Sequence, residues 1–175
     1  PDFIHSILQC PITWQNLRQA NSEELAGTGF SEGLVNSSEK WLYPIHQDII
    51  FLHSQYAVPL DGNSETNKMN FDKERIFNYF NSIKYVDFKG QDIYEDSKQF
   101  VDYRSFMIPY NEHGFARVGK YLSKAGKYFI DVACGPVAFK EYVHLADGFE
   151  YRVCIDQSAT ALMHAKHNLE KNEQK

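Results

Sequence analysis

Two aspartates and a run of small residues carry the clearest chemical signal in this sequence. Asp131 and Asp156 each end a predicted strand, and Ala133-Cys134-Gly135 follows the first of them. Small residues let backbone N–H groups approach a ligand closely, at the start of a helix whose dipole favours anions. An acid at the tip of the second strand can accept hydrogen bonds from both hydroxyls of a ribose. The pattern therefore predicts a nucleoside-binding site.

The elements that must position these residues follow the order strand, helix, strand, helix. Residues 128–132 and 151–155 are rich in aromatic and β-branched side chains, which favour strands. A helix is predicted over residues 138–146, followed by a turn at 147–148. A second helix is expected to begin after Ser158, its predicted N-cap. This order predicts a parallel βαβ unit with a right-handed crossover, and a ligand site beyond the carboxyl ends of its strands.

The loop after the first strand lacks the common phosphate-binding motifs. A Gly-x-Gly-x-x-Gly dinucleotide motif needs more than one glycine, whereas Gly135 is flanked by Ala133 and Val137 at the alternate positions. A Gly-Lys-Ser/Thr phosphate loop does not occur here either. A nicotinamide-cofactor enzyme is therefore the weaker interpretation of the unit.

A resemblance to class I S-adenosylmethionine-dependent methyltransferases rests on two segments. The family's first motif is similar to Ile-Asp-Val-Ala-Cys-Gly-Pro at residues 130–136, and its next segment is similar to Val-Cys-Ile-Asp-Gln-Ser at 153–158. The resemblance implies an α/β fold, the start of a Rossmann-like sheet, with S-adenosylmethionine as cofactor. It implies that the loop faces the methionine part, that Asp156 binds the ribose hydroxyls, and that Asp131 orients the loop or the cofactor's amino group. The implied cofactor-binding residues are Asp131, Ala133, Cys134, Gly135, Pro136, Asp156 and Gln157.

Two departures from this family change what we expect of the site. Ala133 and Val137 stand where the family has glycine, and the branched side chain of Val137 is expected to narrow the methionine pocket. The family's sheet also has later strands, so we expect a truncated, N-terminal portion of a methyltransferase. Its acceptor, a small molecule or a protein, and its catalytic residues are not identified by the sequence. The alternative is a non-catalytic, methyltransferase-like binding or regulatory module.

A second resemblance covers residues 1–60. Cys10-Pro11 and the Tyr-Pro-Ile at 43–45 are similar to anchors of the small zinc-ribbon-like domain of methyltransferase activator subunits. The resemblance implies a β-rich domain, and the apolar run at 49–52 predicts one of its strands. Zinc typically needs four ligands from two Cys-x-x-Cys pairs, whereas Thr13 stands where the partner of Cys10 would be. We therefore predict the scaffold without the metal.

The middle of the chain is predicted to be a linker followed by an aromatic-rich helical cap. Residues 61–70 are polar and turn-rich, and residues 71–127 repeat apolar side chains at helical spacing. We expect Pro109 to end one helix near Ile108 and Gly126 to end the next. Core packing is the favoured role of the aromatics, and a lid over a ligand is the alternative. The repeating positions are Ile76, Phe77, Phe80 and Ile83; Phe100, Tyr103, Met107 and Tyr110; and Phe115, Val118 and Leu122.

Charge and composition limit the classes of partner. The net charge is −5, which argues against nucleic acid, because nucleic-acid binding needs a basic footprint. No segment approaches the roughly 18 consecutive apolar residues of a membrane span, and the first residues do not resemble a signal peptide. The three cysteines are odd in number and far apart, which favours a reducing cytoplasm. An exposed sheet edge favours pairing with a second copy of the chain.

Other reactive residues have a structural interpretation that we favour. Cys134 fits a small buried residue better than a nucleophile. His164 and His167 have the spacing of a metal pair but no evident third ligand, so exposed helix-face histidines are favoured. His113 as a general base, and residues 103–104 as partners of the cofactor carboxylate, are secondary hypotheses.

Overall fold

The computed structural model describes residues 7–61, 71–88, 91–95 and 107–172. The chain divides into two compact units, residues 1–74 and 75–175. Each unit is described by itself. Of the predicted linker at 61–70, all but Asp61 lies outside the described residues.

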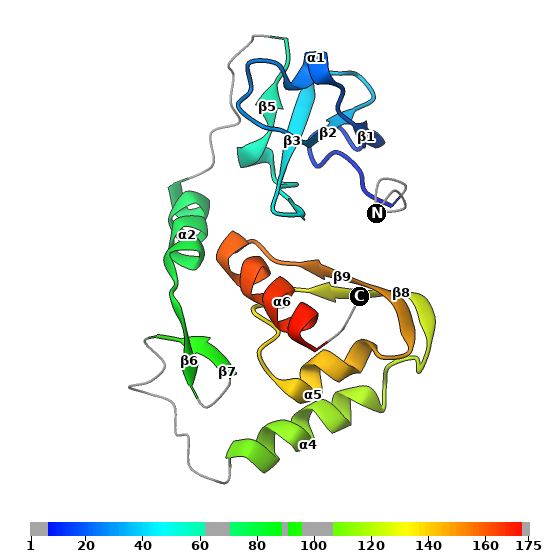
Figure 1. The fold of residues 1–175 in the computed structure, drawn as a ribbon, viewed down its shortest axis with the longest axis vertical. Coiled ribbons are helices and arrows are strands. Elements are labelled where there is room, and N and C mark those ends of the chain that lie inside the picture. The colour runs from blue at the N-terminus through cyan, green and yellow to red at the C-terminus, as the bar shows by residue number, and fades with distance from the viewer. Residues whose placement is uncertain (1–6, 62–70, 89–90, 96–106, 173–175) are drawn as a thin grey trace. The chain divides into compact units, whose positions relative to one another are not determined.

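The N-terminal unit is a curled antiparallel sheet with two short helices (Figure 1). Its elements are β1 (Leu17–Gln19), α1 (Ser22–Leu25), β2 (Gly33–Asn36), β3 (Trp41–His46), β4 (Ile49–Ile50), the 3-10 helix η2 (Ser54–Tyr56) and β5 (Val58–Pro59). The strands pair in the order β1-β2-β3-β4, and β5 also pairs with β3. The strand predicted at 49–52 is therefore present as β4, in its first half.

Successive residues of β2 and β3 alternate between two apolar clusters. Leu34 and Tyr43 pack in one cluster with Cys10, whereas Val35 and Leu42 pack in the other. This alternation follows from the two-residue period of a strand, which sends neighbouring side chains to opposite faces. Both faces of the sheet are therefore covered, as the continuous apolar character of these strands requires.

Cys10, the residue of the predicted lost zinc site, is fully buried. Its Sγ lies 3.1 Å from the hydroxyl of Tyr43 and accepts the N–H of Thr13 at 3.3 Å. Burial raises the pKa of Tyr43, and the neighbouring Cys10 raises it further, so the phenol stays protonated. Within the described ranges, no group of three or more His, Cys, Asp or Glu is placed to hold a metal ion.

The last part of the C-terminal unit is a parallel strand pair followed by a helix, as the sequence predicts. Its elements are β8 (Gly126–Val132), α5 (Lys140–Val143), the 3-10 helix η3 (His144–Ala146), β9 (Phe149–Ile155) and α6 (Ala159–Lys171). The pair is in register from Gly126↔Phe149 to Val132↔Ile155. Ser158 is the N-cap of α6, since its side chain accepts the N–H of Ala161 at 3.1 Å.

One face of the parallel pair is covered and the other is bare among the described residues. Cys134, Val137, Val143 and Ala165 form a buried cluster on the helical side. On the other side, Ile130 is 60%, Val132 70% and Ile155 45% exposed. Parallel sheets are usually covered on both faces. Pairing with a second copy stays a prediction.

The cap segment contains helices, as the sequence predicts, and also a strand hairpin that the sequence-based prediction does not include. Helix α2 (Phe71–Ser82) is followed by an antiparallel hairpin of β6 (Tyr85–Phe88) and β7 (Gln91–Tyr94) (Figure 1). The hairpin places the rings of Tyr85 and Tyr94 on one face, with centroids 5.1 Å apart. Both strands contain aromatic and β-branched residues, which favour this pairing over a helix.

Helix α4 (Met107–Gly119) corrects both predicted helix ends. Pro109 lies in its first turn instead of ending a helix, because the N–H groups of a first turn have no intrahelical partner to lose. Gly126 begins β8 instead of capping a helix. A Cβ there would lie 2.8 Å from the ring of Phe149, which explains why a glycine occupies this strand position. Phe100 and Tyr103 lie outside the described residues.

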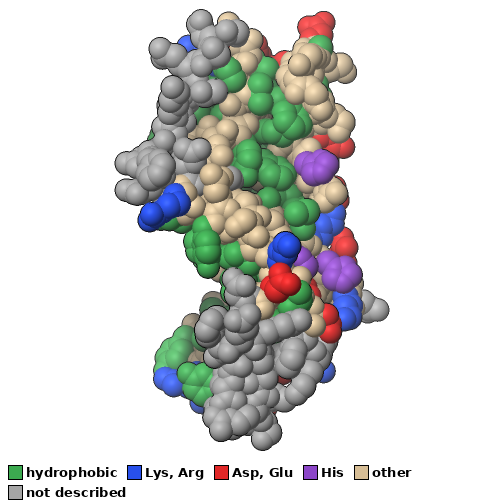
Figure 2. All heavy atoms as spheres, turned by 90° about the vertical axis from the view of Figure 1, so that its left-hand side faces the viewer, with side chains coloured by type: hydrophobic (Ala, Val, Ile, Leu, Met, Phe, Trp, Pro, Cys, Tyr) green, Lys and Arg blue, Asp and Glu red, His purple; other side chains and the backbone are tan. Residues whose placement is uncertain are grey.

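The helices within the described residues are too short or too polar to cross a membrane. On the face drawn in Figure 2, Lys and Arg side chains are scattered among acidic and apolar ones and form no continuous basic patch. The expected absence of a nucleic-acid partner stays a prediction.

Candidate functional site

The loop between β8 and α5 has an unusual backbone. Ala133, Gly135 and Val137 have φ values of +57°, +59° and +48°. Two backbone N–H groups, of Ala133 and Cys134, donate to the carbonyl of Ile155 at 2.7 and 3.3 Å, which ties the loop to the end of β9. The left-handed region suits glycine and is strained for other residues. The backbone therefore favours glycine at all three positions, although only Gly135 is a glycine.

Replacing Ala133 with glycine is expected to stabilise the C-terminal unit by about 1 kcal/mol, because the exposed side chain strains a left-handed backbone. Ala116, an exposed residue inside α4, is the matched control. There the same change should destabilise by about 1 kcal/mol. Urea unfolding followed by circular dichroism checks both signs. Destabilisation by Ala133→Gly would contradict the inference that the backbone is strained at Ala133.

Val137 does not narrow the loop as expected from its branched side chain. The side chain is 1% exposed and packs with Val143 and Ala165 in the core. Gly135, by contrast, faces open space, since a Cβ built on it meets no atom within 4 Å. Its backbone is therefore the part of the loop that a ligand can approach most closely.

Asp156 joins the loop to the start of α6. Its Oδ2 accepts the N–H of Gly135 at 2.9 Å, and its Oδ1 accepts the N–H of Ser158 at 2.9 Å. The structure thus brings together Gly135 and Asp156, two of the predicted site residues. A carboxylate offers about four acceptor positions, so each oxygen keeps capacity for one further donor. Gln157, next in sequence, has an exposed side chain.

Asp131 lies in a buried ion pair that the sequence analysis did not anticipate. Its Oδ2 accepts from Nε of Arg152 at 3.2 Å and from Nη2 at 2.5 Å, and Tyr142 donates its hydroxyl to Oδ1. The side chains of Arg152 and Asp131 are only 2% and 8% exposed. The carboxylate is therefore shielded from solvent, which suits orienting the base of the loop better than contacting a ligand.

Arg152 connects this ion pair to the helical layer. Its Nη1 donates to the carbonyls of Tyr142 and Val143 at 3.3 and 3.1 Å. Its guanidinium lies 4.9 Å from the ring centroid of Tyr142 and 5.4 Å from that of Phe129. Burial, and then the carboxylate of Asp131, raise the pKa of Tyr142, so its hydroxyl remains a donor. An arginine inside an apolar strand was the available sequence signal for this partner.

The end of α2 is bonded to the start of α6. Ser158 donates its hydroxyl to the carbonyl of Phe80 at 2.9 Å, and Asn81 Oδ1 accepts the N–H of Ala159 at 2.9 Å. Thr160 donates its hydroxyl to the carbonyl of Asn81 at 3.2 Å. The first turn of α6, next to Asp156, is therefore covered by α2.

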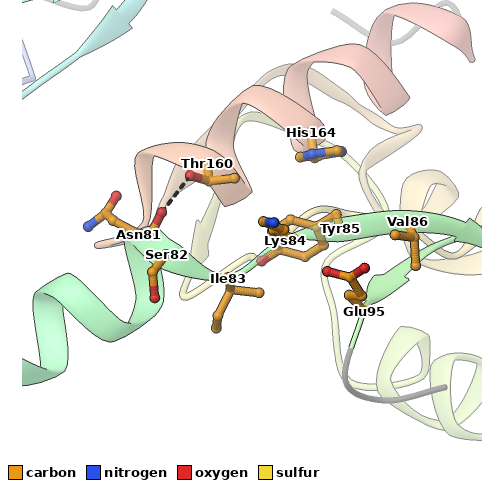
Figure 3. A pocket seen from close by; sticks show the side chains of 9 residues that line it. All are labelled: Asn81, Ser82, Ile83, Lys84, Tyr85, Val86, Glu95, Thr160 and His164. Carbon is orange, nitrogen blue, oxygen red and sulfur yellow. Dashed lines mark hydrogen bonds between the residues drawn. The ribbon is translucent and has the colours of Figure 1, made fainter. Parts of the chain in front are cut away.

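A cavity of about 440 Å³ lies beside this junction (Figure 3). It is lined by residues 81–86, by Glu95 at the end of the hairpin, and by Thr160 and His164 of α6. Its volume is within the range of small-molecule sites, and it is open to solvent rather than enclosed. Asn168, on the same helix as Thr160 and His164, donates to the carbonyl of Pro136 in the candidate loop at 2.9 Å.

His164 is held at this cavity by a carboxylate. Its Nδ1 lies 2.9 Å from Oδ2 of Asp92, and its ring centroid lies 4.6 Å from that of Tyr85. Asn168 donates to the same Asp92 oxygen at 3.0 Å. The contact with Asp92 fixes the orientation of the imidazole ring beside this cavity. His164 is therefore partly buried and bonded within the fold, whereas the sequence analysis favoured an exposed histidine on the helix face.

The other candidates are not brought to the loop by any contact seen among the described residues. His167 is exposed on α6 and His113 is exposed on α4. Residues 103–104 lie outside the described part of the chain. Cys134 is 4% exposed and packs in the core, in line with its favoured role as a small buried residue.

No protein-family model, curated protein or solved structure matches this chain. The functional interpretation consequently depends on the residues and contacts given above.

Proposed function

We propose that the C-terminal unit binds the nucleoside and methionine parts of S-adenosylmethionine, and that the protein is the N-terminal portion of a methyltransferase acting on a small molecule or a protein. The observation that carries the proposal is the bond between the Gly135 N–H and Asp156. It joins the loop after β8 to the acid at the tip of the adjacent parallel strand, where α/β sheets bind nucleotide-like ligands.

The residues present fit such a cofactor. The open side of Gly135 admits close approach of the methionine part to the backbone. Asp156 retains acceptor capacity for a ribose diol beyond its two backbone bonds. Asp131 and Arg152 hold the end of β8 from the covered side. When bound, the cofactor supplies a methyl group on a sulfonium, and transfer to an aligned nucleophile depends largely on proximity.

Calorimetric titration with S-adenosylhomocysteine tests the proposal. We expect one-site binding that weakens at least tenfold, or about 1.4 kcal/mol, in Gly135→Ala and in Asp156→Asn. The first variant places a methyl group where the ligand meets the backbone, and the second removes an anionic acceptor for the ribose.

Gly29→Ala is the matched control for Gly135→Ala. Gly29 has a φ of +80° and also has open space around it, but it lies in the N-terminal unit. It should carry a similar backbone strain and leave binding unchanged. Binding that survives both site variants, or no binding by the parent chain, would contradict the proposed site.

A non-catalytic binding or regulatory module is the second candidate. One observation favours it: both oxygens of Asp156 accept backbone N–H groups, so this carboxylate has a structural role in joining the loop to α6. This candidate predicts a folded C-terminal unit that gives no heat with S-adenosylhomocysteine. The same titration therefore separates the two functions.

A further inference from the structure

Two of the three cysteines meet at the candidate loop. Cys154 lies in β9 in register with Asp131, and Cys134 follows that aspartate in the loop. The N–H of Cys134 donates to the carbonyl of Ile155, next to Cys154. Both side chains belong to one apolar cluster, of which Cys134 is a buried member and against which the partly buried Cys154 packs. All three cysteines are free thiols, and Cys10 lies in the other unit.

The two thiols differ in their readiness to react. A hydrogen bond to Cys154, together with burial, raises the pKa of Cys134, which keeps its proton. The carbonyl oxygen of Gly135, 3.3 Å from the Cys134 Sγ, is an alternative acceptor for the same S–H. The same hydrogen bond and the charge of Arg152 lower the pKa of Cys154 despite burial. Because the thiolate is the nucleophile, Cys154 is the attacking group. It is also the less buried of the two.

We propose that Cys134 and Cys154 are a redox modification site that forms a reversible disulfide with low-molecular-weight disulfides such as oxidised glutathione. The Cys154 thiolate attacks one sulfur of oxidised glutathione and releases one glutathione thiolate. Cys134 then gives up its proton and attacks the Cys154 sulfur of the mixed disulfide, releasing the second glutathione. The two protein thiols lose two electrons and two protons in total, and the oxidant is reduced to two glutathione molecules.

The disulfide would act on the candidate loop. Its S–S bond of about 2.05 Å would draw Cys134 toward β9 and remove the bond from its thiol to the carbonyl of Gly135. Gly135 carries the N–H that meets Asp156. Resting on the proposed function, we expect oxidation to weaken S-adenosylhomocysteine binding at least tenfold, and reduction by dithiothreitol to restore it.

Mass spectrometry of a tryptic digest tests the disulfide directly. The full chain carrying Cys10→Ser is incubated with oxidised glutathione under native conditions and digested without reductant. Trypsin cuts after Lys140 and Arg152, so the cysteines fall in separate peptides, residues 128–140 and 153–166. We expect these peptides to be joined, with the loss of two hydrogens, and to separate on addition of dithiothreitol.

Single-cysteine variants are the matched controls. Cys134→Ser should trap glutathione on Cys154, whereas Cys154→Ser should leave Cys134 unmodified because it is buried and protonated. A stable glutathione adduct on the Cys10→Ser chain, no modification, or linkage only in denaturant would each overturn the proposal. The digest needs no cofactor, so joined peptides without any S-adenosylhomocysteine binding would contradict the proposed function alone.

Discussion

Arg152→Met is expected to destabilise the C-terminal unit by about 3–5 kcal/mol, the loss typical of breaking a buried ion pair from one side. The change leaves the carboxylate of Asp131 buried, and among the described residues only the hydroxyl of Tyr142 then donates to it. It also removes the donors to the carbonyls of Tyr142 and Val143. Hydrogen exchange of the β8 and β9 amides measures the loss.

Two further variants separate the charge from the geometry. Arg152→Lys keeps the charge but loses the planar fork, so we expect a smaller loss than for methionine. Adding Asp131→Asn to Arg152→Met should recover part of the stability, because the uncompensated charge is gone. Strictly additive losses would show that the two side chains do not interact.

The tryptophans supply an internal control for this experiment. Trp14 and Trp41, the two in the chain, both lie in the N-terminal unit. Tryptophan fluorescence should therefore report an unchanged unfolding of that unit in every Arg152 variant. A fluorescence midpoint that moves with Arg152 would indicate that the two units unfold together.

The parallel unit was predictable because its signals are local and agree with one another. Aromatic and β-branched runs give β8 and β9, and the N-cap at Ser158 gives the start of α6. The hairpin in the cap segment was not predicted, because the helical spacing on both sides of it was extended across the whole segment. Most of the repeating positions lie in α2 and α4, whereas β6 and β7 contribute none of them. The pair Lys89-Gly90 between two short runs of aromatic and β-branched residues was the available hairpin signal.

The candidate site was predictable in position but not in chemistry. The sequence places Gly135 and Asp156 at the ends of neighbouring strands, and the structure joins them by a hydrogen bond. The sequence does not reveal that Asp131 forms a buried ion pair with Arg152, because that pairing depends on cross-strand packing. Nor does it reveal that Val137 turns into the core despite a positive φ, since a tertiary contact there outweighs a local backbone preference.

Asn36→Ala is expected to destabilise the N-terminal unit by about 3–5 kcal/mol. Asn36 is fully buried, and its Oδ1 accepts the backbone N–H groups of Lys40 and Trp41 at 3.0 and 2.9 Å. Its amide also donates to Gln15 Oε1 at 2.9 Å and to Ser38 Oγ at 2.8 Å. Each buried polar group left without a partner costs about 1–3 kcal/mol. The alanine variant should therefore lose more stability than the smaller side-chain volume alone would cause.

Trp41 makes this loss directly measurable, because its backbone N–H donates to the side chain of Asn36. Urea unfolding followed by tryptophan fluorescence should shift strongly for Asn36→Ala. The neighbouring Ser37→Ala, which removes an exposed hydroxyl bonded to the carbonyl of Asn16, should shift it by no more than about 0.5 kcal/mol. Equal small shifts for both variants would mean that water replaces Asn36 and that the side chain does not organise this corner of the sheet. A large shift for Asn36 alone would assign to one buried amide the role that a bound metal has in zinc-dependent domains, which is to fix loops that a small core cannot hold.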